Sequence, residues 1–352
     1  MTDWIAFLQQ QGGLVAADGE PTAAITGFGE QPADYPALLS TTLLMSLDDR
    51  GVIRLTGPDT DKLLQGQLTC DLSAITPDNA GNGALCTVQG RTIGNFPIAR
   101  DGAGDTLLLP PAALMPAILE TLKKYAVFYK TQLNDDSARY QVLGLAGPDA
   151  SQLIAAISGS APTGSCHHHQ GTTFLQLGDQ RWLAVAPGDS ARQLWQQLAR
   201  RATPAGLPLW ELLAIRAGQG EVRPATREEF IPQMLNLQHT GGISFRKGCY
   251  TGQEIVARMQ YLGKLKRRMY RLAIAATTPP GPGTKIQADA GGPNCGHVVL
   301  AARADQQTLE LLAVLTAEAA AGQQLLIDGQ AHAIRALPLP YDHQFPAHAD
   351  GG

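Results

Sequence analysis

The sequence predicts an α+β protein in which two α/β halves are followed by a small C-terminal β-barrel. The first observation is an internal echo: residues 52–59 and 142–149 each read as a strand ending in Gly-Pro-Asp, and an amphipathic helix follows each. Two such units can enclose a ligand, although Gly-Pro-Asp is also a common helix opener that can recur by chance. The second observation is a change after residue 266, where short apolar runs alternate with Gly- and Pro-rich turns, as in small barrels.

These patterns divide the chain into four parts. Residues 1–39 form an acidic N-terminal arm without Lys or Arg, with one short helix around Trp4 to Gln10 and an otherwise loose, extended course. Residues 40–265 hold the two α/β halves, residues 266–341 form the β-barrel, and residues 342–352 are a disordered tail.

Further elements follow from local patterns. A hairpin turn is expected at 100–105, and Ala- and Leu-rich helices at about 112–124 and 190–201. The strands expected in the barrel are 269–275, 296–302, 309–314, 324–327 and 331–337, with 285–286 after a Pro-rich loop.

Composition limits the class of protein. An apolar fraction of 44% and a charged fraction of 16% are typical of a soluble, folded protein, and 352 residues exceed one core. No run of about 18 apolar residues occurs, and the N-terminus lacks a basic leader, so we expect a cytoplasmic protein without membrane contact. The cysteines show no metal-ligand spacing, which predicts free thiols and no metal site. They are Cys70, Cys86, Cys166, Cys249 and Cys295.

One segment, Lys-Gly-Cys-Tyr-Thr-Gly-Gln-Glu at 247–254, predicts a reactive thiol. Thr251 and Glu254 have the spacing of a capping box, so a helix should begin here. Cys249 then lies just ahead of the positive end of that helix, beside Arg246 and Lys247. Both effects favour the thiolate, with Lys247 as its stabiliser, and predict a pKa below the free value of about 8.5.

Two glycines flank this cysteine. Gly248 and Gly252 would keep the backbone bare on either side of the sulfur, where a partner must approach closely. The alternative interpretation is an inert cysteine in a tight strand-to-helix turn.

A basic strip follows the thiol. Residues 243–271 carry eight cations against Glu254 alone, a local charge of +7 (8 − 1) in a chain of net charge −4. Such a cluster can attract a phosphate, a polyglutamate tail or an RNA backbone, although a charge cluster alone is also typical of a solvated strand face. Five of these cations form what we call the basic strip: Arg258, Lys264, Lys266, Arg267 and Arg268.

Two other features have plain structural interpretations. Residues 166–169 read Cys-His-His-His, but the Pro and Gly residues around them predict a solvated loop rather than a metal site. Trp210 opens an apolar helix and, taken alone, is more typical of a core anchor than of a stacking platform.

Several motifs together resemble the YgfZ family of folate-binding proteins, which is linked to iron–sulfur cluster maintenance and tRNA modification. Residues 247–254 match its motif at eight consecutive positions, and the resemblance covers about residues 40 to 341. The other matching segments are 47–49, 65–69, 122–128, 230–233, 236–238, 241–245 and 337–341.

The resemblance implies the fold of the glycine-cleavage T-protein, an aminomethyltransferase in which two interlocked α/β domains and a β-barrel surround a central folate channel. It implies tetrahydrofolate or another folate derivative as cofactor, with Cys249 as a functional thiol exposed near the folate and Trp210 as a folate-stacking tryptophan. It also implies iron–sulfur enzymes as partners, such as those that thiolate tRNA, and a possible contact with tRNA.

Three positions depart from the family pattern. Arg50 replaces a tryptophan that relatives can carry, and we expect it to stack on the pterin or to pair with a folate carboxylate. Arg216 falls where T-proteins have a glutamate suited to the pterin. No carboxylate lies between Leu109 and Glu120, where the T-protein's catalytic acid would fall, which argues against aminomethyl transfer.

The leading hypothesis is therefore a folate-binding accessory protein, rather than a conventional enzyme, that supports iron–sulfur cluster assembly or repair and tRNA modification by sustaining iron–sulfur enzymes, including those that thiolate tRNA. One alternative is a tetrahydrofolate-dependent aminomethyltransferase, for which Asp71 is the nearest candidate acid unless it merely caps a turn. The other alternative is an RNA-binding module that uses the basic residues 258–271.

Overall fold

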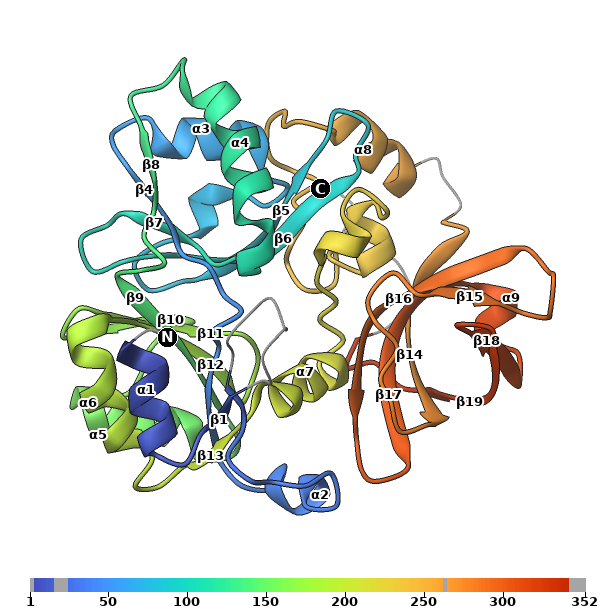
Figure 1. Ribbon diagram of the computed structural model, residues 1–352. Helices are drawn as coiled ribbons and strands as arrows, with labels where there is room; N and C mark the ends of the chain where they lie inside the picture. Colours follow the sequence, from blue (N-terminus) through green and yellow to red (C-terminus); the bar gives the residue numbers. More distant parts are fainter. Residues whose placement is uncertain (1–2, 16–24, 262–264, 342–352) are drawn as a thin grey trace.

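The computed structural model describes residues 3–15, 25–261 and 265–341, and shows two sheet-based domains and a β-barrel (Figure 1). The first domain is an antiparallel five-stranded sheet with the order β5-β6-β7-β4-β8. Helices α3 (Thr60–Gln67) and α4 (Met115–Ala126) contact each other beside it. Its strands are β4 (Ile53–Thr56), β5 (Gly81–Cys86), β6 (Thr92–Arg100), β7 (Thr106–Leu108) and β8 (Gln132–Asp135).

The second domain is a six-stranded sheet with the order β10-β11-β12-β9-β3-β13, antiparallel except for the last pair. Helices α1 (Asp3–Gln10), α5 (Ala150–Ser158) and α6 (Gly188–Leu198) bury their apolar faces in one core with this sheet. Its strands are β3 (Leu43–Ser46), β9 (Tyr140–Ala146), β10 (Cys166–His169), β11 (Thr172–Gln176), β12 (Arg181–Pro187) and β13 (Thr203–Ala205).

The C-terminal part is a closed six-stranded barrel with the order β14-β17-β16-β15-β18-β19. Its interior is filled by Leu, Ile, Val and Ala side chains, and the short helix α9 (Ala317–Ala320) joins that core. The predicted β-barrel is thereby confirmed. Its strands are β14 (Arg267–Ala275), β15 (Lys285–Gln287), β16 (Asn294–Arg303), β17 (Thr308–Thr316), β18 (Gln324–Ile327) and β19 (Gln330–Leu337).

The internal echo corresponds to two equivalent strand–turn–helix units. β4 leads through Gly57 into α3, and β9 leads through Gly147 into α5. Both glycines have positive φ angles, +113° and +127°, and a Cβ at either would lie within 2.4 Å of a backbone carbonyl oxygen, so each turn requires glycine. The predicted hairpin between β6 and β7 and the predicted helices α4 and α6 are also present.

The short helix predicted around Trp4 to Gln10 is present as α1, which buries Trp4 and Leu8, and Trp4 Nε1 donates a hydrogen bond to Ser46 Oγ over 2.9 Å. The prediction of a loose course for the rest of 1–39 was wrong where the structure describes it, because Ile25 and Tyr35 are buried in the hydrophobic core. The remaining elements here are β1 (Leu14–Val15), β2 (Ile25–Gly27) and α2 (Tyr35–Leu38). The predicted tail at 342–352 lies outside the described residues.

The Cys-His-His-His segment is also not a loop. It forms β10, which pairs with β11 through a turn at Gly171, where φ is +77°. Gly164 and Gly171, which predicted a loop, therefore flank a strand, and Gly171 forms the hairpin turn. Within the described residues no cluster of His, Cys, Asp or Glu has a metal-binding geometry.

Helix α7 (Leu207–Arg216) lies where the second domain meets the barrel. It contacts β3 of the six-stranded sheet and β16 and β17 of the barrel (Figure 1). The largest buried cluster continues from the five-stranded sheet through α7 to barrel residues such as Leu300 and Leu312. Short 3-10 helices, Pro224–Thr226 and Pro232–Leu235, follow α7 before α8 (Gln253–Tyr261) returns the chain to the barrel. The others are Leu72–Ala74 and Ala112–Leu114.

Candidate functional site

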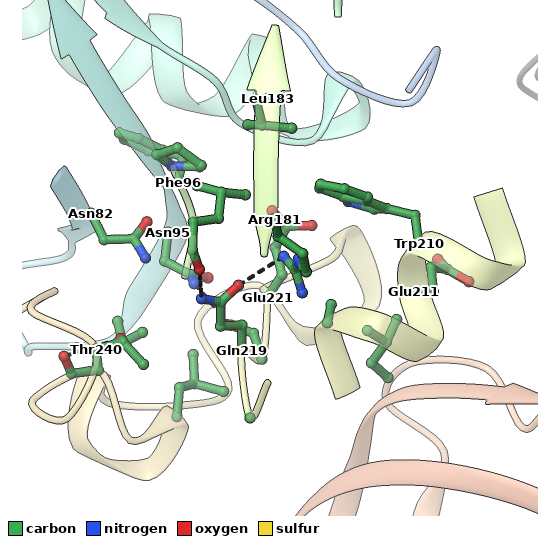
Figure 2. Close-up of a pocket in the computed structure, with 18 of the residues that line it drawn as sticks. Asn82, Asn95, Phe96, Arg181, Leu183, Trp210, Glu211, Gln219, Glu221 and Thr240 are labelled. Carbon is green, nitrogen blue, oxygen red and sulfur yellow. Dashed lines mark hydrogen bonds between the residues drawn. The ribbon is translucent and has the colours of Figure 1, made fainter. Parts of the chain in front are cut away.

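A pocket, which we call the central pocket, is walled by residues of both sheet domains and the barrel. Figure 2 shows residues that line it. Asn82 and Phe96 come from the five-stranded sheet, Arg181 from β12 and Leu300 from the barrel. Trp210 and Glu211 of α7 form another part of the wall, as does the segment after α7. The predicted residues Trp210 and Arg50 both line this pocket, which spans the junction where a central channel was expected.

A network of ion pairs crosses the pocket wall. Arg50 and Glu221 form a bidentate pair, in which Arg50 Nη2 lies 2.9 Å from Glu221 Oε2. Arg223 lies 2.8 Å from Asp49 Oδ2, 3.3 Å from Glu221 and 3.6 Å from Glu211. Bidentate guanidinium–carboxylate pairs are strong and rigid, so this network joins the segment before β4 to α7 and to the segment after it. The side chain of Arg50, predicted to contact the pterin or a folate carboxylate, is thus held by Glu221.

The carboxylates of this network differ in their protonation. Burial opposes ionisation of Asp49, but the charges of Arg50 and Arg223 outweigh it and lower its pKa. Glu211, whose side chain is 27% exposed at the pocket wall, is affected most by burial, which raises its pKa to about 7 against the attraction of Arg223. A carboxyl that titrates near neutral pH in a pocket is a candidate functional group.

Trp210 packs closely against Arg181 and Gly144. The guanidinium carbon of Arg181 lies 4.6 Å from the ring centroid on one side. Gly144 of β9 lies so close to the indole that a Cβ there would be 2.8 Å from Cε3. Trp210 is only 2% exposed, so its indole packs as a core anchor while it lines the pocket. Stacking of a ligand on this ring stays a prediction.

The predicted reactive cysteine is exposed at the tip of a firmly held loop. We call residues 242–252 the Cys249 loop; it is hydrogen-bonded to the chain between Gly66 and Cys70. Thr251 N donates to Gly66 O over 3.0 Å, and Ser244 N donates to Thr69 O over 2.9 Å. Two motifs that looked separate in the sequence, 65–69 and 247–254, are therefore one structural unit.

Lys247 lies inside this unit. Its Nζ donates to Leu68 O over 2.8 Å and to Cys70 O over 2.7 Å, and lies 5.2 Å from the ring centroid of Tyr250. Burial lowers the pKa of Lys247 to about 8. The ammonium is thus bound to backbone carbonyls, and its expected role as stabiliser of a Cys249 thiolate stays a prediction.

The helix after Cys249 begins at Gln253, close to the predicted start, but the predicted capping box was wrong. Thr251 Oγ1 donates to Gln67 Oε1 over 3.2 Å, and Gln253 Oε1 accepts from Tyr250 N. The Thr251 side chain is drawn away because the loop packs against the end of α3. Cys249 is not among the described residues that line the central pocket.

The described members of the basic strip do not converge on one point. Arg258 lies exposed on α8, and Lys266 is exposed just ahead of β14. Arg267 donates to Asn294 O, and Arg268 is half-buried on β14. Lys266 and Arg267 line a hollow of about 380 Å³. Lys264 lies outside the described residues.

Two departures noted in the sequence have structural explanations. Arg216 pairs with Glu310 of the barrel, with Nη2 2.9 Å from Oε1, and so connects α7 to β17. Asp71 caps the turn at Leu72–Ala74 and accepts hydrogen bonds from Ser73 N and Gln65 Nε2. Asp71 therefore has the capping role that was the alternative to catalysis.

Sequence reasoning missed Arg181, Glu211, Glu221 and Arg223 as pocket residues. The sequence evidence for these residues was that they are charged and, for three of them, lie next to Trp210 or in the segment after α7. This evidence was weak because Arg50 pairs with Glu221, a residue 171 positions away in the sequence.

The architecture matches a known class. The glycine cleavage system aminomethyltransferase T from Bartonella henselae has a TM-score of 0.70 over 96% of this chain and 97% of its own, at 15% identity. The chain therefore has the fold of the glycine-cleavage T-protein. No protein-family model matches the sequence.

Individual relatives identify the family. The tRNA-modifying protein YgfZ of Pectobacterium carotovorum is 36% identical over 91% of this chain and 98% of its own length. The proteins of the same name from Yersinia pestis and Sodalis glossinidius are 36% and 35% identical, over 90% and 85% of this chain and 97% and 92% of theirs. The chain belongs to the YgfZ family of tRNA-modifying proteins. No helix among the described residues is long and apolar enough to span a membrane.

Proposed function

We propose that this protein is a cytoplasmic folate-binding accessory protein that supports iron–sulfur enzymes, including those that thiolate tRNA. The observation that carries the proposal is the central pocket, which has walls from all three parts of a T-protein fold and contains Trp210 and Arg50. Tetrahydrofolate is the proposed ligand, and the name of the relatives supports a role in tRNA modification.

Cys249 is the proposed functional thiol, acting in redox chemistry or as a transient ligand of a damaged cluster. Its support is its position: it is exposed, whereas Cys70, Cys86, Cys166 and Cys295 are buried. Burial raises the pKa of Cys70 to about 11 and of Cys166 to about 12, so these thiols are unreactive at neutral pH.

The test is complementation of a strain that lacks its own copy of the protein. Cys249→Ser should lose most of the tRNA thiolation while keeping the folded structure and tetrahydrofolate binding, because the exposed thiol supports no packing. Cys295→Ser is the matched control, because a hydroxyl can replace the bond from Cys295 Sγ to Ile286 O. Full thiolation with Cys249→Ser would remove the thiol from the proposal.

Aminomethyl transfer is the second candidate, and Glu211 is the observation that favours it. A carboxyl with a pKa of about 7 in a pocket suits general acid–base catalysis, and the segment after β7 supplies no acid before Glu120. The third candidate, RNA binding by the basic strip, is supported by the exposed Arg258 and Lys266.

A further inference from the structure

Arg181, the first residue of β12, has unpaired donors in the wall of the central pocket. Its side chain is buried, with 7% of the residue exposed, and its Nη2 donates to Gln219 Oε1 over 2.8 Å (Figure 2). Gln219 is itself fixed, because its Nε2 donates to Leu177 O over 2.7 Å. Arg181 Nε and Nη1 have no hydrogen-bond partner among the described residues. Buried polar groups in native proteins are generally paired, so these donors call for an acceptor from outside the chain.

The other arginines of the pocket differ from Arg181. Arg50 and Arg223 each form an ion pair with Glu221, whereas Arg181 has no salt bridge to a described carboxylate. It lies instead over the indole of Trp210, which stabilises the cation without using its N–H groups. Burial and the charge of Arg50 lower the pKa of Arg181 to about 9, which leaves it charged at neutral pH. Water can satisfy such donors until a ligand displaces it.

The surroundings limit the ligand. Glu211 and Glu221 line the same pocket, so a ligand there meets hydrogen-bond acceptors as well as the donors of Arg181. The carboxylates can in turn accept hydrogen bonds from an amino group of the same ligand. The pocket volume of about 60 Å³ holds on the order of five waters.

We propose that Arg181 determines the ligand specificity of the central pocket by donating a hydrogen bond from one of its two unpaired donors, Nε or Nη1, to the oxo group of a bound 2-amino-4-oxopyrimidine ring. Pterins and guanine share this ring, and the proposal rests on the proposed folate function for the choice of a pterin. Beyond that function, Arg181 is the group that distinguishes an oxo from an amino substituent on the ring.

The test compares tetrahydrofolate with its counterpart in which the oxo group is replaced by an amino group. Wild type should prefer the oxo compound about 10- to 100-fold, because an amino group would meet the N–H donors of Arg181 with a donor of its own. Arg181→Met keeps apolar contact with Trp210 but removes the donors, and should reduce the preference to about 1-fold. Arg192→Met, at an exposed arginine of α6 that does not line this pocket, should retain it.

The outcomes separate this inference from the proposed function. An unchanged preference in Arg181→Met overturns the inference and leaves folate binding intact. If neither compound binds to wild type, the folate proposal is overturned. Guanosine, titrated in parallel, then tests the role of Arg181 alone. Oxo-dependent binding of guanosine that Arg181→Met abolishes supports the inference, and no binding of guanosine overturns it. If Arg181→Met does not fold, Arg181→Lys replaces it, with a preference reduced at least 5-fold as the supporting result and an unchanged preference as the contrary one.

Discussion

The ammonium of Lys247 is bound by the carbonyls of Leu68 and Cys70, in a site that is 9% exposed. Because these bonds join the Cys249 loop to the end of α3, Lys247 holds the cysteine in place through the backbone. Its neighbour Arg246 is exposed. Lys247 and Arg246 are adjacent cations in the sequence, but only Lys247 is buried and bound to backbone carbonyls.

Lys247→Met should lower the free energy of unfolding by about 1–3 kcal/mol, because two buried carbonyls lose their donor. Arg246→Met should change it by less than about 0.5 kcal/mol, as at other exposed positions. Urea unfolding of both variants measures this difference. Equal stability of the two variants would show that the buried ammonium does not hold the loop.

Glu211 predicts a pH dependence of stability. Its folded pKa of about 7 lies above the ordinary glutamate value, so the unfolded chain releases this proton first as the pH rises. Its contribution to stability is therefore present below about pH 4.5 and is lost as the pH rises to about 7.

Glu211→Gln removes this titration and should flatten the change in the urea midpoint between those pH values. Glu318→Gln, at an exposed position of α9, should leave the wild-type profile unchanged. A Glu211→Gln profile that coincides with wild type would mean that Glu211 titrates normally in the folded protein.

At the scale of elements, the Cys249 loop packs against the turn between β5 and β6. Gly252 has a φ of +84°, and a Cβ there would lie 2.5 Å from Thr87 O and 3.0 Å from Gly90 Cα. The bare backbone at Gly252 thus serves contact within the protein, whereas Gly248 has nothing within 4 Å of its Cβ position. Both glycines were expected to let a partner approach the sulfur. This stays a prediction for Gly248, whereas the backbone of Gly252 is already in contact with the turn.

Gly252→Ala should destabilise the protein by about 1–3 kcal/mol, through backbone strain and the clash with the turn. Gly248→Ala should be tolerated to within about 0.5 kcal/mol. Thermal unfolding together with the rate of Cys249 alkylation measures both effects, and the rate should change only in Gly252→Ala. Equal behaviour of the two variants would contradict the packing described here.

Elements defined by short-range patterns could be predicted from the sequence. β4 with α3, β9 with α5, and the barrel strands were visible because apolar alternation and Gly-Pro turns act locally. The course of residues 25–39 and the strand β10 were missed, because their conformation depends on the sheets they join.

At the scale of the whole molecule, the pocket could be predicted only in part. Trp210 and Arg50 were found through a family resemblance, whereas Arg181, Glu211 and Glu221 were missed. These side chains meet only when the domains are assembled, and no local spacing encodes the pairing of Arg50 with Glu221. The sequence showed which residues carry functional side chains, but it did not show which of them pair with each other in the folded protein.

Calorimetric titration measures the proposed binding of tetrahydrofolate to the central pocket. Wild type should show saturable binding at one site. Ala214→Leu, which fills the pocket from α7, should weaken this binding at least 10-fold. Ala217→Leu, just beyond the pocket wall, is the control. No heat of binding in wild type, or equal affinity in Ala214→Leu, would show that tetrahydrofolate does not bind in this pocket.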